Sequence, residues 1–211
     1  GHLAVAGDCE VSIVARGENL AAIQRRGLRV VTPERDFTVP VNAVGSAREL
    51  SVQDVVLITL KSHQFADMLG DITTLMHRET LVLPPTTGLP DFIFANPGRD
   101  EGPLPMRSVA GIVYWVAAHM PGPGIVKQDG QGASLLLGEI DGSTTRRIEA
   151  LSQLLTASGI HSPVRCDIRA DIWVKFVNSL CWNPVAILTG VDVAAIAADQ
   201  AIAGLIATMM A

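Results

Sequence analysis

The chain has 211 residues and a formal net charge of -5, with 48% hydrophobic and 18% charged residues. An acidic chain of this composition is a poor general surface for nucleic acid. The uncharged stretch 176–191 is interrupted by asparagine and proline, and it falls short of the ~20 apolar residues of a membrane span. Neither nucleic acid nor a membrane is therefore expected as a partner, and the absence of a secretion signal favours a cytoplasmic protein.

Strand and helix patterns alternate over the first 165 residues. Short runs rich in β-branched residues predict strands at 10–15, 28–32, 37–41, 55–60, 80–83, 108–115, 124–127 and 134–137. Helical spacing predicts a stub at 1–7 and helices at 19–26, 63–75 and 144–158. Ser46 and Glu49 have the spacing of a capping box. Alternation of this kind is typical of an α/β fold with a mainly parallel, doubly wound sheet.

Only helical patterns follow residue 167. They cover 168–181, 185–188 and 193–210, and they are rich in alanine. We therefore expect a domain boundary near residue 165, with an α/β domain at 1–165 and the start of an all-α domain at 166–211. The Ala-rich helices offer a face through which a homodimer is expected to form. The chain opens abruptly and its last helix has no stop signal, so both ends of the fold are expected to be incomplete.

Arg16 directly follows the strand expected at 10–15. This strand is the second of a dinucleotide-binding unit if another strand precedes it. In such a unit an acid at this place binds the ribose 2′-hydroxyl, whereas an arginine accommodates the 2′-phosphate of NADP. The alternative is a solvated arginine at the end of a strand.

Lys61 follows the apolar strand at 55–60, at the carboxyl end where ligands bind in open α/β sheets. Gln64 comes one helical turn later and is expected to face the same crevice. Thr87 and Gly88 lie in a loop after the next strand, where they place a hydroxyl group and an unhindered backbone near a ligand. Alternatively, Lys61 is a residue that only flanks its strand and binds no ligand.

Lys175 lies in an otherwise apolar helix, with Asn178 beside its face and with Ser179 and Asn183 four and eight residues further on. On an α-helix, positions four and eight residues apart share one face. An unpaired buried ammonium is costly, so Lys175 needs a partner, and a ligand carboxylate or a reacting carbonyl oxygen would serve. Burial also lowers a lysine pKa toward the range of general acids. The alternative partner is Asp171, one turn earlier.

Three segments in this order resemble the ketopantoate reductase family: Val14-Ala-Arg-Gly17, Leu57-Ile-Thr-Leu-Lys-Ser-His-Gln64 and Trp173 to Pro184. The resemblance covers essentially the whole chain. It implies a Rossmann-type NADP-binding domain and a helical substrate and dimerisation domain, with the active site between them. It also implies reduction of a 2-keto acid to a 2-hydroxy acid with NADPH, of the pantothenate-pathway type.

Residue by residue, the resemblance makes Lys175 the general acid and Arg16 the contact to the 2′-phosphate. Lys61 and Gln64 match residues that line the cofactor side of the cleft, and Asn183 matches an asparagine of the substrate pocket. The remaining candidates are the substrate-binding pair Ser179 and Asn178 and the cofactor-binding residues Gly1, Thr87 and Gly88. Gly1 matches the end of the family's glycine loop, whose earlier residues are absent from this sequence. No metal site is expected, since the histidines and cysteines lack ligand spacing.

Two other functions remain open at this point. A catalytically altered NADP-binding or sensing protein of the same fold is suggested by Thr87 and Ser179, where the family has asparagines. A structural or interaction module is suggested by the helical end alone. NADPH-dependent reduction of a 2-keto acid is the leading hypothesis, motivated by Arg16, Lys61 and Lys175.

Overall fold

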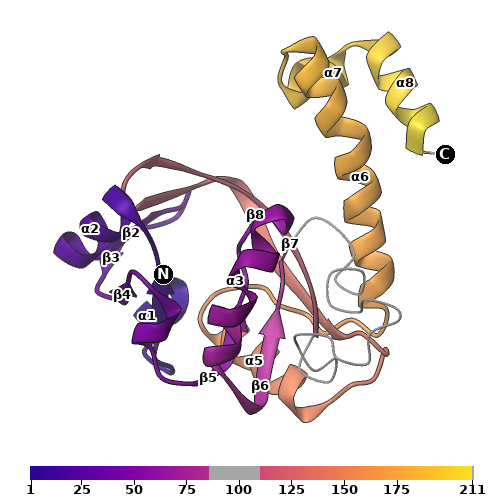
Figure 1. The fold of residues 1–211 in the computed structure, drawn as a ribbon. Helices are drawn as coiled ribbons and strands as arrows, with labels where there is room; N and C mark the ends of the chain where they lie inside the picture. Colours follow the sequence, from indigo (N-terminus) through magenta and orange to yellow (C-terminus); the bar gives the residue numbers. More distant parts are fainter. Residues whose placement is uncertain (86–109, 211) are drawn as a thin grey trace.

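The computed structural model describes residues 1–85 and 110–210 of the chain. Its strands are β1 Ser12–Val14, β2 Leu28–Val31, β3 Asp36–Val39, β4 Asn42–Val44, β5 Gln53–Leu57, β6 Met76–Leu83, β7 Ala110–Gly122 and β8 Ile125–Glu139. Its helices are α1 His2–Ala6, α2 Gly17–Arg26, the 3-10 helix η1 Ala47–Glu49, α3 Ser62–Thr74, α5 Arg146–Ala157, α6 Ile168–Thr189, α7 Val193–Ala198 and α8 Gln200–Met210. Strands thus precede helices α5 to α8, as expected (Figure 1).

Parallel pairing joins strands that are separated by other elements in the sequence. β1 pairs with β4, β5 pairs with β6, and β2 pairs with β8, each in parallel. Two hairpins, β2–β3 and β7–β8, add antiparallel neighbours and complete a sheet of order β3-β2-β8-β7. The strands predicted at 28–32 and 37–41 are therefore confirmed and form the first of these hairpins. Parallel strands alternate with helices α2 and α3, as the sequence indicated.

Local signals also predict the ends of elements. The stub α1 ends at Gly7, which adopts the left-handed conformation with φ 78° that glycine tolerates best. The capping box is present: the Ser46 hydroxyl accepts a hydrogen bond from Arg48 N, and Glu49 Oε1 accepts one from Ser46 N. It begins the short helix η1, which connects β4 to β5.

The two runs predicted at 124–127 and 134–137 belong to one strand, β8, and this corrects the predicted division. Trp115 pairs with Ser134, whereas Ala117 pairs with Asp129, so the register shifts within the hairpin. Extra residues of β8 around Gly130, which has φ 72°, are accommodated at this shift. An irregular pairing of this kind bends a strand without ending it, so the interruption of the pattern did not mark a loop.

Helix α6 also corrects a prediction, because it continues through Pro184 to Thr189 instead of stopping near Cys181. Proline removes one intrahelical hydrogen bond and normally breaks or kinks a helix. Here Cys181 and Val185, four residues apart, are both buried in one cluster with Ile196 of α7 and Ile206 of α8. This packing on both sides of the proline holds the helix together.

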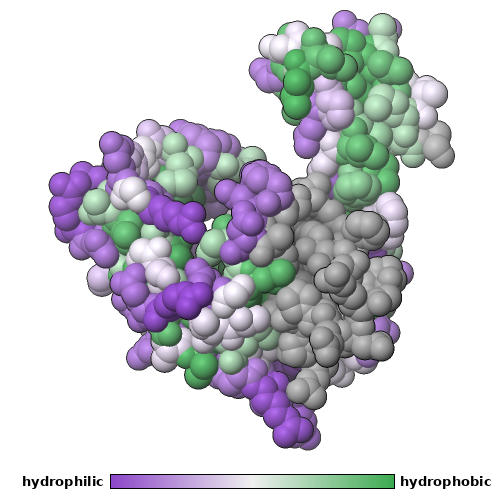
Figure 2. Space-filling view, in the orientation of Figure 1, coloured by the Kyte–Doolittle hydropathy of each residue, from purple (hydrophilic) through white to green (hydrophobic). Residues whose placement is uncertain are grey.

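The end of the chain lies away from the sheets. Helix α6 begins against β7 and β8, leads away from them, and carries α7 and α8 at its far half (Figure 1). Hydrophobic residues cover much of this end on the face shown in Figure 2, and Ile187 and Leu188 are 80% and 85% exposed. In the described part of the chain, no helix has the length and apolar character needed to cross a membrane. The domain boundary near residue 165 and the homodimer stay predictions.

Candidate active site

Helix α6 places Lys175 by packing two earlier turns on the sheet. Its first turn is capped by Asp167, whose Oδ1 accepts a hydrogen bond of 3.0 Å from Ala170 N. Ile168 and Ile172 are buried against Val113 of β7. Lys175 follows at the i, i+4, i+7 spacing of one helix face, so it also faces the sheet. The apolar anchor therefore determines which surface the lysine meets.

The surface that Lys175 meets is aromatic. Its Nζ lies 4.2 Å from the centre of the Tyr114 ring and 5.0 Å from the centre of the Trp115 ring. Both distances are within the range of cation–π attraction. The side chain is half-buried, and burial lowers the pKa of the Lys175 ammonium. A lysine with a lowered pKa gives up its proton more readily, which suits general-acid chemistry.

Asp171 is not the partner of Lys175. Its carboxylate binds Arg165, with 2.7 Å from Arg165 Nε to Asp171 Oδ2. Among the residues that the structure describes, Lys175 has no ion pair with a carboxylate. The structure thus favours the interpretation in which the ammonium of Lys175 is available to a ligand.

The other candidates of α6 continue along the helix. Asn178 and Ser179 are half-buried, and Asn183 is exposed. Ser179 and Asn183 follow Lys175 at four and eight residues, so all three lie along one side of α6, as predicted. The side chains of Asn178, Ser179 and Asn183 form no hydrogen bond with another described residue. Toward the described part of the chain their donors and acceptors are unpaired, and their role in substrate binding stays a prediction.

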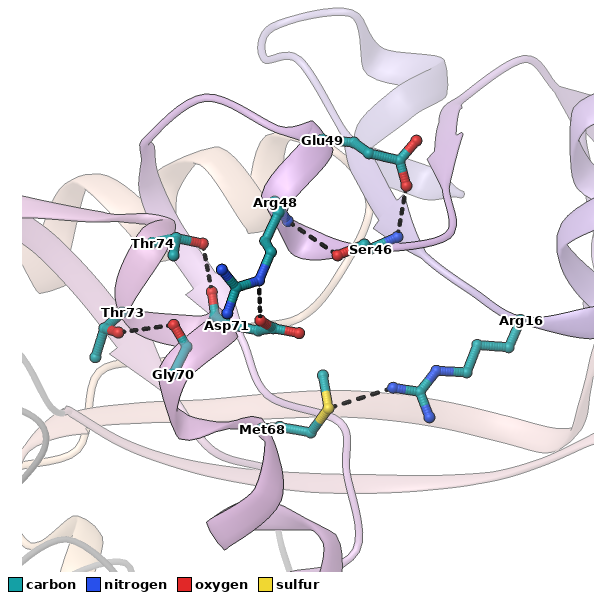
Figure 3. Close-up of polar contacts among 9 residues, drawn as sticks. All are labelled: Arg16, Ser46, Arg48, Glu49, Met68, Gly70, Asp71, Thr73 and Thr74. Atoms are coloured by element: carbon teal, nitrogen blue, oxygen red, sulfur yellow. Dashed lines mark hydrogen bonds and ion pairs between the residues drawn. The ribbon is translucent and has the colours of Figure 1, made fainter.

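Arg16 lies at the carboxyl end of β1, where it is the residue before α2. Its side chain is exposed and extends to α3, where Nη2 lies 3.3 Å from Sδ of Met68 (Figure 3). A thioether is a weak acceptor and leaves the guanidinium charge unbalanced. In the described part of the chain, Arg16 has no carboxylate partner, so it suits an anionic group such as a phosphate.

Helix α3 carries two more candidates at its start. Lys61 is the residue before the helix, and its side chain is exposed. Gln64 Oε1 accepts a hydrogen bond of 3.2 Å from Lys61 N, so Gln64 caps the first turn. Strand β5 ends at Leu57, three residues earlier than predicted, and a short link leads to Lys61. Gln64 therefore has a structural task that the sequence did not reveal.

An ion pair fixes the other end of α3. Arg48 of η1 binds Asp71 with 2.8 Å from Nε to Oδ1 (Figure 3). Because η1 follows β4, which pairs with β1, this contact ties α3 to the strand pair that carries Arg16. Arg16 therefore contacts α3 at Met68, and Lys61 is the residue immediately before the same helix.

The remaining predicted positions lie elsewhere. Gly1 precedes α1 and packs against Val30, so that a side chain at this position would clash with Val30 Cγ2. Thr87 and Gly88 lie outside the described residues. Tyr114 and Trp115 were not among the site residues predicted from the sequence. The available signal was the single tyrosine of the chain, followed by tryptophan, at the end of an apolar strand.

Comparison with known proteins shows to which family the chain belongs. The family model described as Ketopantoate reductase PanE/ApbA matches residues 1–142. A 2-dehydropantoate 2-reductase of Mesorhizobium japonicum is 36% identical over 99% of this chain and 68% of its own length. The chain therefore spans about two thirds of that relative.

Solved structures agree on the fold. The structure of 2-dehydropantoate 2-reductase from Geobacter metallireducens has a TM-score of 0.87 and 26% identity, and the match covers 99% of this chain and 67% of the other. A D-mandelate dehydrogenase structure with NADH and anilino(oxo)acetate has a TM-score of 0.84 at 22% identity, covering 98% of this chain and 65% of the other. The predicted α/β fold, Rossmann-like with a helical end, is confirmed. Members of the matching family are oxidoreductases that depend on NADH or NADPH. The chain belongs to the ketopantoate reductase family.

Proposed function

We propose that this chain forms the larger part of an NADPH-dependent reductase that converts a 2-keto acid, 2-dehydropantoate or a related compound, to the 2-hydroxy acid. The observation that carries the proposal is the half-buried Lys175 without a carboxylate partner among the described residues. Such an ammonium has N–H donors to offer to the oxygen of a carbonyl group. Family membership supports the same reaction class.

The chemistry assigns one task to Lys175. When bound, the nicotinamide supplies a hydride to the carbonyl carbon of the substrate. The developing charge on the carbonyl oxygen is stabilised by the Lys175 ammonium, which then transfers a proton from Nζ to that oxygen. The neutral amine regains its proton from solvent. The product is a hydroxyl group, so electrons and protons balance with one hydride and one proton taken up.

The preference for NADPH is supported by Arg16. The guanidinium follows β1 at the place where a dinucleotide-binding unit contacts the adenosine ribose. It is exposed and contacts only a thioether in the described part of the chain. A 2′-phosphate would provide the charge partner that Arg16 lacks, whereas a 2′-hydroxyl would not. As part of the same proposal, the reaction is a step of pantothenate synthesis in the cytoplasm.

Spectrophotometric assay of NADPH oxidation by the full-length protein tests the proposal. The substrates are 2-dehydropantoate, a short aliphatic 2-keto acid and an aryl 2-keto acid. We expect turnover with at least one of them, and a loss of about a hundredfold or more in kcat for Lys175→Ala, as for removal of a general acid. Lys127→Ala is the matched control, because Lys127 is exposed on β8. An absence of turnover with all three substrates would refute the reductase and favour a cofactor-binding protein without activity.

A further inference from the structure

The contacts of the Lys175 ammonium have an unusual composition. In the described part of the chain, the groups that approach Nζ are two aromatic rings, Tyr114 at 4.2 Å and Trp115 at 5.0 Å. A half-buried charge is ordinarily balanced by a carboxylate with hydrogen bonds. Here the negative faces of the ring quadrupoles provide the attraction instead.

Both acids in the first turns of α6 are engaged elsewhere. Asp167 caps the helix, since its Oδ1 accepts a hydrogen bond from Ala170 N. Asp171 binds Arg165 through both carboxylate oxygens. A carboxylate on Nζ would occupy its N–H donors and would compete with an anionic substrate. Ring faces attract the charge without accepting three directed hydrogen bonds, so donors remain for a ligand.

The aromatic pair lies where β7 leaves the core. The strand is buried from Ala110 to Val113, half-buried at Tyr114, and 37% exposed at Trp115. Neighbouring side chains of a regular strand point to opposite faces of the sheet. The pairing with β8 shifts its register immediately after Trp115, and at this irregularity the two consecutive rings approach one ammonium. The irregularity in the pairing of β7 with β8 therefore lies next to Lys175.

We propose that Tyr114 and Trp115 are positioning residues for Lys175, which hold its ammonium in place through their ring faces and leave its N–H donors to the substrate. The catalytic part of this proposal rests on the proposed reductase function. It assigns the rings a task that depends on their aromatic faces. The tyrosine hydroxyl and the indole N–H are not required. Replacement by another aromatic residue is therefore tolerated, whereas replacement by an aliphatic residue is not.

Enzyme kinetics of the full-length protein test the catalytic part. We expect Tyr114→Phe and Trp115→Phe to stay within about threefold of the wild type in kcat, because cation–π attraction persists with phenylalanine. The double variant Tyr114→Leu/Trp115→Leu is expected to lose about tenfold or more in kcat, the effect of a misplaced catalytic group. The Kd for NADPH is expected to stay within about twofold, which separates positioning from a general loss of structure. Wild-type kcat in the double leucine variant, or equal losses with phenylalanine and leucine, would overturn the proposal.

Nuclear magnetic resonance tests the geometry without any turnover. Reductive methylation with ¹³C-formaldehyde labels lysine Nζ atoms, and the sequence holds three lysines, Lys61, Lys127 and Lys175. The methyl signal that disappears in Lys175→Met is expected to be displaced upfield by the two rings. In the double leucine variant it should return to the position of exposed lysines, whereas Tyr114→Phe keeps it displaced.

The two methods distinguish failure of the positioning from failure of the reductase. A displaced methyl signal in a protein that reduces no 2-keto acid would support the contact with the rings and refute the proposed function. An active enzyme whose Lys175 signal is not displaced would refute the positioning and leave the reductase intact. Circular dichroism of each leucine variant checks the fold, and Trp115→Leu alone serves as the milder variant if the double variant does not fold.

Discussion

Gly111 of β7 lies directly opposite Gly138 of β8, and the fully buried side chain of Ile168 rests on this pair. A Cβ added at Gly111 would approach Ile168 Cγ1 to 2.6 Å, and one at Gly138 would approach the Arg165 carbonyl oxygen to 2.5 Å. The absence of side chains at both positions lets the first turn of α6 approach the sheet closely. Since Lys175 is two turns further along, this contact determines where the lysine lies.

Substitution of Gly138 should therefore disturb both stability and activity. Gly138→Ala forces a methyl group against backbone and against Ile168, and overpacking of this kind costs about 1–3 kcal/mol. We expect a lower midpoint in urea unfolding. Because α6 shifts, we also expect kcat to fall by a larger factor than the Kd for NADPH rises. Gly122→Ala is the control, because the nearest atom to an added Cβ there is Ile125 Cδ1 at 3.9 Å. Equal effects of the two substitutions would show that the close contact with α6 is unimportant.

The pH dependence of reduction should reveal Lys175. Burial lowers its pKa from the usual value near 10.5, and the ammonium is the form that donates the proton. The value of kcat/KM should therefore fall as the pH rises through this lowered pKa. Lys175→Arg should remove this alkaline limb, because an arginine keeps its charge throughout, although its overall activity is expected to be low. A limb that persists in Lys175→Arg would assign the titration to another group.

The same pKa shift affects stability with a defined sign. In the folded protein Lys175 binds its proton less tightly than in the unfolded chain. Between the two pKa values the unfolded state therefore carries more protons, and the free energy of unfolding rises with pH. Lys175→Met should weaken this rise in urea unfolding measured at several alkaline pH values. Lys127→Met, at an exposed position of β8, is the matched control.

The choice of cofactor should depend on Arg16. Arg16→Ala removes the cation expected to bind the 2′-phosphate, and a lost charge-assisted hydrogen bond corresponds to about 1.5–3 kcal/mol. The Kd for NADPH in titration calorimetry should accordingly rise about tenfold to a hundredfold. The Kd for NADH should change little. Arg25→Ala is a matched control on α2, because Arg25 is exposed and donates to Ala21 of its own helix. A parallel loss for both cofactors would contradict a 2′-phosphate contact.

Glu139 should contribute to stability but not to catalysis. It is buried at the end of β8, where Arg147 donates 2.8 Å and 2.5 Å hydrogen bonds to its two carboxylate oxygens and Thr145 donates a third. Glu139→Gln weakens these charge-assisted bonds and should lower the free energy of unfolding by about 2 kcal/mol. Glu34→Gln, at an exposed position between β2 and β3, should have almost no effect. A loss of activity without a loss of stability in Glu139→Gln would indicate a role beyond structure.

Short-range patterns in the sequence predicted most of the elements and much of the candidate site. The capping box at Ser46 and the stop at Gly7 were readable because their interactions lie within four residues. Likewise, the spacing of Lys175, Ser179 and Asn183 follows from helical geometry alone. Positions of Arg16 and Lys61 at strand ends followed from the alternation of strands and helices.

Long-range contacts decided the rest. Helix α6 passes through Pro184 because Cys181 and Val185 are buried against α7 and α8, which no local pattern expresses. Two such contacts decided which groups meet Lys175. Arg165 engages Asp171, and the register shift between β7 and β8 brings Tyr114 and Trp115 to the ammonium. The sequence by itself determined the class of fold and the residues capable of chemistry. Only the tertiary structure decided which of them meet, because such contacts form between segments that are far apart in the chain.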